Sequence, residues 1–337
     1  MTRRAFLRLL PWLLGAGLLF LIVQAISFQE VLTIIKRLRL WQIAVLVAAN
    51  GFVLLTLAGR WWVLLRGQGY RVPFGLLLGY RLAVFGLSYF TPGPHVGGEP
   101  LQVLLVEREQ GVPRSAALAA VALDKAIEFS VNFAFLLLGI AAVLRWRIVP
   151  QQAGQQALGL AAALLFMPLL YLGVTGRGYY PATRAARRMA GLPFLHRAAP
   201  RLSAAAATLE ESERQVGRFA ARAPWAFAAA IAVTLVSWAA LIGEYWLMVN
   251  FLGVRLTLPQ LVTAITAARI AILLLLPAGL GALELSQTLA YGALGLDPAV
   301  GLSVSLLIRA RDSLVGVFGL WWGSRRVLAT NRKKSSR

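Results

Sequence analysis

The sequence contains no cysteine and only two histidines, His95 and His196, among its 337 residues. The missing cysteine excludes a disulfide, a thiolate metal site and a cysteine nucleophile. Two histidines nearly exclude a metal centre built from several imidazoles. We therefore expect neither a metal nor a cofactor in this protein.

Charged residues are also scarce, above all acidic ones. They make up 14% of the chain, whereas 59% of it is hydrophobic, and a soluble domain carries roughly 25% charged residues. We therefore expect an integral membrane protein. Lys and Arg number 34 against 13 Asp and Glu, for a net charge of +21. No soluble nucleic-acid-binding module is visible, so we interpret the basic residues as determinants of membrane orientation that contact anionic lipid head groups.

Six segments are apolar over about the 20 residues that a spanning helix needs. They are 9–28, 40–65, 115–144, 155–174, 225–252 and 300–322. The first has the features of a signal peptide, but no convincing small-x-small cleavage site follows it, so we favour an uncleaved span. Two more apolar stretches, 74–106 and 259–294, are interrupted near the middle by proline and glycine. The sequence thus predicts an all-α membrane protein with about six full spans and two broken segments.

Basic residues in the loops predict the orientation of these spans. With the N-terminus in the cytoplasm, the inside holds Arg66, Arg71, Arg108, Arg114, the segment 177–222 with nine arginines and the tail 325–337. The outside keeps Lys36, Arg37, Arg39, Arg145, Arg147 and Arg255. This count requires each broken segment to enter and leave on the same side, and it places both termini in the cytoplasm.

The two broken segments match each other at an offset of 185 positions. Pro92 and Pro277, Glu99 and Glu284, Gln102 and Gln287, and Pro113 and Pro298 coincide, as do Trp61 and Trp246 upstream. Residues 40–145 and 225–325 are therefore predicted to be two copies of one unit. Because three spans separate their starts, the copies are expected to be inverted, as in many transporters whose site lies between the repeats.

Proline and glycine at the breaks predict irregular backbone, which membrane depth tolerates only inside protein or beside a watery cavity. We predict two re-entrant helical hairpins whose tips meet near the middle. Glu99 would open a half-helix, where the helix dipole favours a negative charge, and Pro100 fits its first turn. The predicted break residues are Pro92, Gly93, Gly97, Gly98, Pro277, Gly279 and Gly281.

Ionisable residues within the apolar segments give the candidate site, because such groups are costly in lipid and usually face a cavity or one another. The predicted substrate path consists of Arg81, Arg269, Asp124, Lys125, Glu128, Arg309, Arg311 and Asp312 around a centre formed by Glu99 and Glu284. Glu244 is a further charge, in the fifth span. Arginines would receive an anionic head group, and carboxylates a cationic group or a proton. The alternative is a set of structural ion pairs that lock the hairpins to the spans.

The polar segment 177–224 is predicted to be a cytoplasmic amphipathic connector. Leu202, Leu209 and Val216 recur every seven residues, with Glu210, Glu211, Glu213 and Arg214 between them. This pattern is typical of a helix on the membrane surface. The segment is too small for a catalytic domain, so we interpret residues 1–337 as one membrane domain.

Four motifs resemble a known family. AGRWWVLLR (58–66), PGPHVGGE (92–99), GVPRSAALAAVALDK (111–125) and PAGLGALE (277–284) are similar to the membrane domain of lysylphosphatidylglycerol synthases, a flippase-like family with many stand-alone members. The resemblance covers residues from about 5 to 325. It implies a fold that moves a phospholipid, such as an aminoacylated phosphatidylglycerol, between leaflets of a bacterial inner (plasma) membrane.

The sequence also departs from this family. The synthases carry a soluble aminoacyl transferase domain after the membrane part, whereas this sequence ends at Arg337, so lipid lysylation is not implied. Gln102 and Lys125 stand where the family often has arginine. The head group is therefore open, and so are the direction and energy source of transport and any homo-oligomer. No nucleotide-binding P-loop is present.

We therefore expect a lipid flippase and not an enzyme, with membrane lipids as its partners. One alternative is a secondary transporter of a small soluble anion, which predicts a closed cavity instead of one open to the bilayer. Another is a membrane-embedded polyprenyl-phosphate transferase, which requires a metal-binding acidic pair such as Asp124 and Glu128. The lack of a DxxD-like motif on a cytoplasmic loop argues against the transferase. A structural partner of another membrane enzyme is the remaining alternative.

Overall fold

The computed structural model describes residues 33, 34, 36, 38–91, 97–148, 150–192, 199–273 and 281–335, and the side chains up to residue 326. Over these residues the chain is helical and contains no strand, as the sequence predicts. The predicted first span 9–28, both histidines and the break residues Pro92, Gly93, Pro277 and Gly279 lie outside the described residues.

Five predicted spans fall within the described residues, and each is a helix. They are α3 (Leu40–Gly67), α6 (Arg114–Arg145), α7 (Gln151–Gly176), α10 (Pro224–Phe251) and α13 (Pro298–Ser335). The first four are long and apolar enough to cross a membrane. Helix α13 carries Arg309, Arg311 and Asp312 within its apolar part. These charges become important at the candidate site.

Each broken segment forms two short helices with the break between them. The first forms α4 (Phe74–Phe90) and α5 (Glu99–Gln110), and the second forms α11 (Leu258–Leu273) and α12 (Ala282–Ala293). Glu99 is the first residue of α5 and Glu284 lies in the first turn of α12, as predicted. The lengths of 17, 12, 16 and 12 residues fall short of the about 20 residues of a full crossing. The helices therefore have the lengths that broken segments require.

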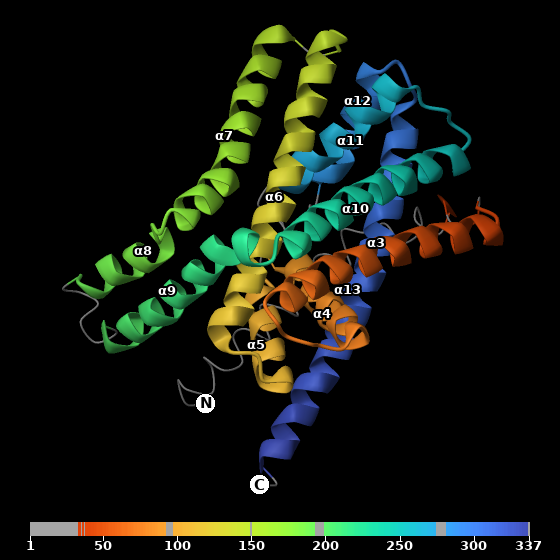
Figure 1. The fold of residues 1–337 in the computed structure, drawn as a ribbon. Helices are drawn as coiled ribbons and strands as arrows, with labels where there is room; N and C mark the ends of the chain where they lie inside the picture. The colour runs from red at the N-terminus through yellow and green to blue at the C-terminus, as the bar shows by residue number, and fades with distance from the viewer. Residues whose placement is uncertain are drawn as a thin grey trace, which may run out of the picture.

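The predicted copies pack against each other reciprocally. Helix α3 lies alongside α10, α4 of the first copy packs on α13 of the second, and α11 of the second copy packs on α6 of the first. In Figure 1, α4 and α5 lie toward one end of the molecule and α11 and α12 toward the other. Contacts that run in both directions between the two copies are what an inverted repeat would produce. The repeat itself stays a prediction.

Each copy also has its own apolar cluster. One is formed by α3, α4, α5 and α6 around Trp61, Tyr80 and Val106, and the other by α10 to α13 around Val249, Ala264 and Tyr291. Burying this apolar surface stabilises each four-helix unit. The candidate site lies where the two units meet.

Small residues allow α4 and α13 to approach closely. A Cβ added to Gly319 would lie 2.0 Å from the carbonyl oxygen of Leu82, and one added to Gly86 would lie 2.4 Å from that of Gly316. Small residues at helix contacts are typical of membrane proteins, because close backbones gain van der Waals contact. This contact fixes the position of α13, which carries three charges of the candidate site.

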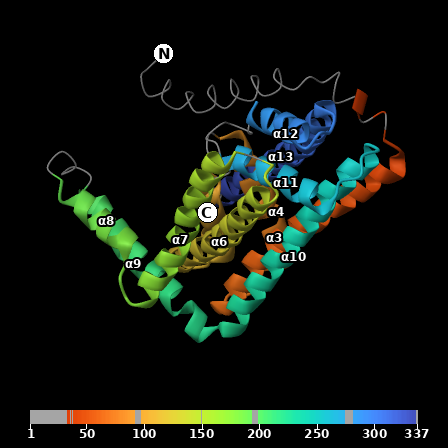
Figure 2. The ribbon, with the colours of Figure 1, turned by 90° about the horizontal axis from the view of Figure 1, so that it is seen from above.

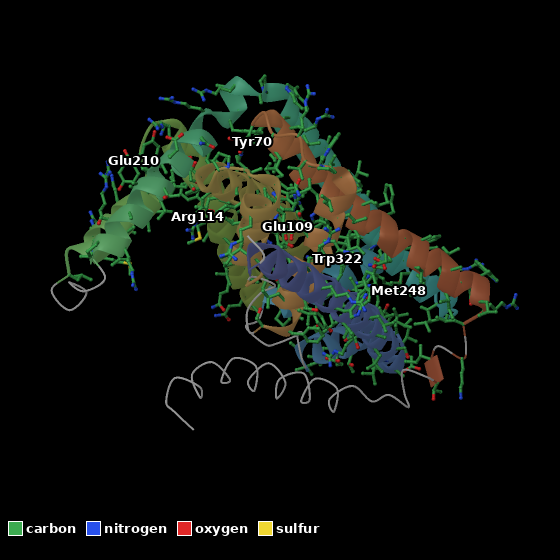
Figure 3. All side chains as sticks on the ribbon, turned by 90° about the horizontal axis from the view of Figure 1, so that it is seen from below. Tyr70, Glu109, Arg114, Glu210, Met248 and Trp322 are labelled. Atoms are coloured by element: carbon green, nitrogen blue, oxygen red, sulfur yellow. The ribbon has the colours of Figure 1, made fainter. Side chains whose placement is uncertain are left out.

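The connector folds as a hairpin of two helices, α8 (Pro181–Ala190) and α9 (Ala199–Arg222), that extends from the bundle (Figures 1 and 2). Glu213 is 1% exposed and accepts hydrogen bonds from the backbone nitrogens of Ala182 and Thr183, both at 2.9 Å, and from Oγ1 of Thr183 at 2.7 Å. It therefore caps α8. It is buried there because α8 folds back onto α9. Glu210, labelled in Figure 3, pairs at the surface with Arg187.

Candidate functional site

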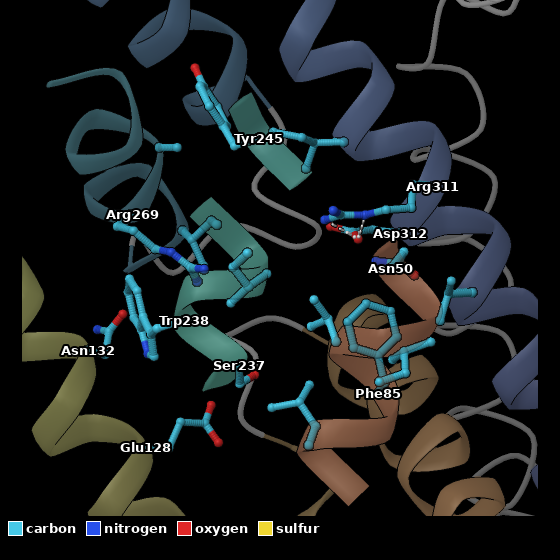
Figure 4. Close-up of a pocket in the computed structure, with 18 of the residues that line it drawn as sticks. Asn50, Phe85, Glu128, Asn132, Ser237, Trp238, Tyr245, Arg269, Arg311 and Asp312 are labelled. Atoms are coloured by element: carbon cyan, nitrogen blue, oxygen red, sulfur yellow. Dashed lines mark hydrogen bonds and ion pairs between the residues drawn. The ribbon is translucent and has the colours of Figure 1, made fainter. Parts of the chain in front are cut away.

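A cavity of about 280 Å³ lies among α3, α4, α6, α10, α11 and α13, with Leu283 of α12 also in its wall (Figure 4). Most of its wall is apolar and includes Val84, Phe85, Phe129 and Leu241. The charged side chains that line it are Arg60, Arg81, Lys125, Glu128, Arg269, Arg311 and Asp312. Charges of both signs thus face one small space inside an otherwise apolar bundle.

On one side of the cavity, two arginines share two carboxylates. Asp124 is fully buried and accepts hydrogen bonds from Nε of Arg60 at 2.6 Å and from Nη1 of Arg81 at 2.9 Å. Glu128, one turn further along α6, lies 2.8 Å from Nη2 of Arg60 and 3.5 Å from Nη2 of Arg81. Buried charges persist only when they are paired in this way. The cluster joins α3, α4 and α6.

Lys125 connects this cluster to the first break. Its Nζ lies 3.1 Å from Oε1 of Glu99 and 3.5 Å from Oε2 of Glu128. The other oxygen of Glu99 accepts a hydrogen bond from the backbone nitrogen of Gly97 at 2.6 Å, and Gly98 donates to Oγ of Ser88 at 2.9 Å. Glu99 therefore binds the start of its own half-helix to the long helix α6.

The second break is held in a related way. Glu284 pairs with Arg309 of α13 through both carboxylate oxygens, at 2.6 and 2.7 Å. On the next turn of α12, Gln287 accepts a hydrogen bond from the hydroxyl of Tyr245 and donates to the carbonyl oxygen of Ala264 at 3.0 Å. In both copies, the glutamate after the break binds a cation on the fourth helix of its copy.

The far side of the cavity holds Arg311. Its Nη1 lies 2.8 Å from Oε2 of Glu244, which is 1% exposed, and its Nε donates to Oδ1 of Asp312 at 2.9 Å. Figure 4 shows Arg311 and Asp312 facing the cavity together. This group joins α10 to α13.

Arg269 of α11 differs from the other cations. Its guanidinium carbon lies 4.5 Å from the ring centroid of Trp238, a cation–π contact. Within the described part of the chain, no carboxylate lies within ion-pair distance of it. Ser237 and Asn132 also line the cavity. Arg269 is therefore a cation that lines the cavity and forms no direct ion pair with a carboxylate of the described residues.

The structure divides the predicted path into two sets. Arg81, Lys125, Glu128, Arg269, Arg311 and Asp312 line the cavity, whereas Asp124, Arg309, Glu99 and Glu284 do not. We expected Glu99 and Glu284 at the centre, but each pairs with a cation at a break instead. The break residues Gly97, Gly98 and Gly281 are likewise not among the lining residues. The described residues contain no group of three or more His, Asp or Glu that could hold a metal ion.

Sequence reasoning missed Arg60. This residue is 1% exposed, lines the cavity and binds both carboxylates of α6. The signal was present, because Arg60 is an arginine in the middle of a predicted span and lies within one of the family-like motifs. It was treated only as part of the motif.

Long apolar helices around a charged interior define a multi-pass membrane protein. The family model described as the lysylphosphatidylglycerol synthase TM region matches residues 8–319, and the chain belongs to this family. A relative described as a UPF0104 membrane protein, from Pyrococcus horikoshii, is 21% identical over 312 residues, which cover 88% of this chain and 90% of the relative. No solved structure matches the chain significantly.

Proposed function

We propose that this protein moves a lipid between the two leaflets of a membrane. The head group would cross through the cavity while the acyl chains stay in the bilayer. The observation that supports this is the cavity of about 280 Å³ with charges of both signs in its wall. Ligand pockets span roughly 300–1,000 Å³. This cavity is thus at the small end, suited to a head group and not to a whole lipid.

Apolar side chains on the outside of the bundle fit the same proposal. Leu160, Phe166 and Met167 on α7 are exposed, as are Val236 on α10 and Val317 on α13. In a bilayer these side chains would face lipid tails, while the charged groups stay inside. A charged head group would then replace its water of hydration with contacts to charged side chains, and it would not have to cross the hydrocarbon core of the bilayer.

We place the protein in a bacterial inner (plasma) membrane with both termini in the cytoplasm, because that orientation keeps most loop arginines inside. Its partners would be anionic or aminoacylated phospholipids. We propose transport and not an enzymatic reaction. With no P-loop in the sequence, an ion gradient or downhill scrambling would drive the movement.

Transport of a small soluble anion is the second candidate, and Arg269 is the residue that favours it. A cation that lines the cavity and forms no ion pair with a carboxylate of the described residues could receive a free anion as well as a lipid phosphate. The two candidates differ in the access that they require. A lipid must enter the cavity laterally from the bilayer, whereas a soluble anion need not.

The test is transbilayer movement of fluorescent phospholipids in proteoliposomes, followed by chemical quenching of the outer leaflet. Val84 lines the cavity, whereas Val236 is 47% exposed on the outside of α10. We expect Val84→Trp to fill the cavity and abolish movement, and Val236→Trp, the matched control, to leave it unchanged. If the two variants move every tested lipid equally fast, the cavity is not the lipid path.

A further inference from the structure

Arg269 is set apart from the other cations of the cavity by its surroundings. Arg60 and Arg81 bind Asp124, Lys125 binds Glu99, and Arg311 binds Glu244. Arg269 instead lies over the face of Trp238, 4.5 Å from the ring centroid. Stacking on one face leaves the edge of a guanidinium, which carries its five N–H donors, able to bind an oxyanion.

A second group in the same region also lacks a partner. Ser237, next to Trp238 on α10, is 2% exposed and lines the cavity, and its hydroxyl has no hydrogen-bond partner among the described residues. A buried hydroxyl without a partner is unfavourable, so it requires a ligand or another explanation. Among the described residues, the cavity wall therefore holds an unused donor as well as a cation without an ion-pair partner.

Three helices bring these groups together. Figure 4 shows Arg269 from α11 against Trp238 from α10, with Asn132 from α6 beside them, whereas Ser237 of α10 lies lower, toward Glu128. The indole ring of Trp238 fixes the guanidinium plane of Arg269, so little freedom is left to lose when a ligand binds. A flexible arginine on the surface would lose more conformational freedom when it binds a ligand.

We propose that Arg269 and Ser237 form a binding site for one phosphate-type oxyanion, with Trp238 as the platform that positions Arg269. Two N–H groups of the guanidinium would donate to two phosphate oxygens, and the hydroxyl of Ser237 would donate to the same group. This inference rests on the proposed function, in which the oxyanion is the phosphate of the lipid head group. The same chemistry also fits free phosphate, so the test must separate the two sources.

The experiment measures binding by the purified full chain in detergent micelles, without transport. The probes are dimyristoyl phosphatidic acid, dimyristoylglycerol, which lacks the phosphate, and inorganic phosphate, and native mass spectrometry reports the bound lipid. We expect Arg269→Gln to weaken binding of phosphatidic acid about tenfold or more, and Ser237→Ala to weaken it about threefold. Binding of dimyristoylglycerol should not change in either variant.

The matched control is Arg255→Gln, which removes an exposed arginine from the loop before α11. It should bind all probes like the unaltered protein. Ser237→Ala is a small change in a buried position, so it keeps the test valid if Arg269→Gln does not fold. Unchanged binding of phosphatidic acid in Ser237→Ala and in folded Arg269→Gln would overturn the site.

The outcomes also separate this site from the proposed function. Binding of phosphatidic acid that needs Arg269, in a protein that moves no lipid in vesicles, keeps the site and contradicts the flippase. Binding of inorganic phosphate alone through Arg269 keeps the oxyanion site and favours a soluble anion. Lipid movement with binding unaffected by Arg269→Gln keeps the flippase and contradicts the site.

Discussion

Arg309 of α13 holds the carboxylate of Glu284 through two contacts, at 2.6 and 2.7 Å, directly after the second break. Lys125 of α6 contacts Glu99 directly after the first break, at 3.1 Å. In each case a half-helix with a glutamate in its first turn is held by an ion pair to the long helix that follows it. These pairs fix where the broken segments sit relative to the cavity.

Breaking the pair of Arg309 and Glu284 is expected to destabilise the protein strongly. The side chain of Arg309 is 2% exposed and that of Glu284 is 18% exposed, so Arg309→Leu leaves Glu284 with an uncompensated charge in a largely buried place, at a cost of up to about 3–5 kcal/mol. The double variant Arg309→Leu/Glu284→Leu should recover most of this loss. The measurement is the free energy of unfolding in detergent micelles. Arg187→Leu, which breaks an exposed pair with Glu210, should cost only about 0–1 kcal/mol.

Arg60 is expected to be essential for the cluster on α6. Arg60→Met removes the shorter of the two arginine contacts of both Asp124 and Glu128 and leaves Arg81 as their remaining arginine partner, and we expect it to lower the stability by about 3–5 kcal/mol. Arg60→Lys keeps the charge but not the two-pronged contact, so it should lose less. Thermal unfolding in micelles measures both. Arg66→Met, at the exposed end of the same helix, is the control, and an equal loss there would show that the buried contacts are not the cause.

The close contact of α4 and α13 should not tolerate a side chain. Gly319→Ala places a Cβ against the carbonyl oxygen of Leu82, and we expect a loss of about 1–3 kcal/mol from overpacking. Gly51→Ala in α3 is the matched control, because nothing lies within 4 Å of its added Cβ. There the substitution should be neutral or stabilising by about 0.5–1 kcal/mol. Equal stabilities of the two variants would mean that the helices are not in close contact.

Glu213 is expected to hold the α8–α9 hairpin together. Glu213→Gln weakens three hydrogen bonds to the start of α8 and should cost about 1–3 kcal/mol locally. Hydrogen exchange of the backbone amides of 181–190 should become faster, while exchange in α6 stays the same. Glu211→Gln, which changes a surface carboxylate of the same helix, should leave exchange in α8 unaltered. Protection of α8 in the Glu213→Gln variant would contradict the capping role.

Much of the fold was predictable because its signals are local. The five described spans lie where hydrophobicity placed them, and their boundaries agree within a few residues except at the end of α13, which continues to Ser335 instead of residue 322. Glu99 and Glu284 begin or lie near the start of their half-helices, as the break pattern indicates. The candidate charges were also identified, except for Arg60, which was overlooked within a motif.

The arrangement of those charges was not predictable from the sequence. Arg60 and Asp124 are 64 positions apart, and Arg81 and Asp124 are 43 apart, so their pairing depends on how α3, α4 and α6 pack. The same packing moves Glu99 and Glu284 away from the cavity wall and brings Arg269 to the face of Trp238. No pattern in the sequence predicts which of several charged side chains will form an ion pair with one another.

The sequence by itself thus determined a helical membrane protein with two broken segments, because the length of apolar runs and the backbone limits of proline and glycine act over a few residues. Only the tertiary structure decided which charges neutralise one another and which face the cavity. The physical reason is that an ion pair requires two side chains within a few ångströms, and in this protein the packing of distant helices sets that distance.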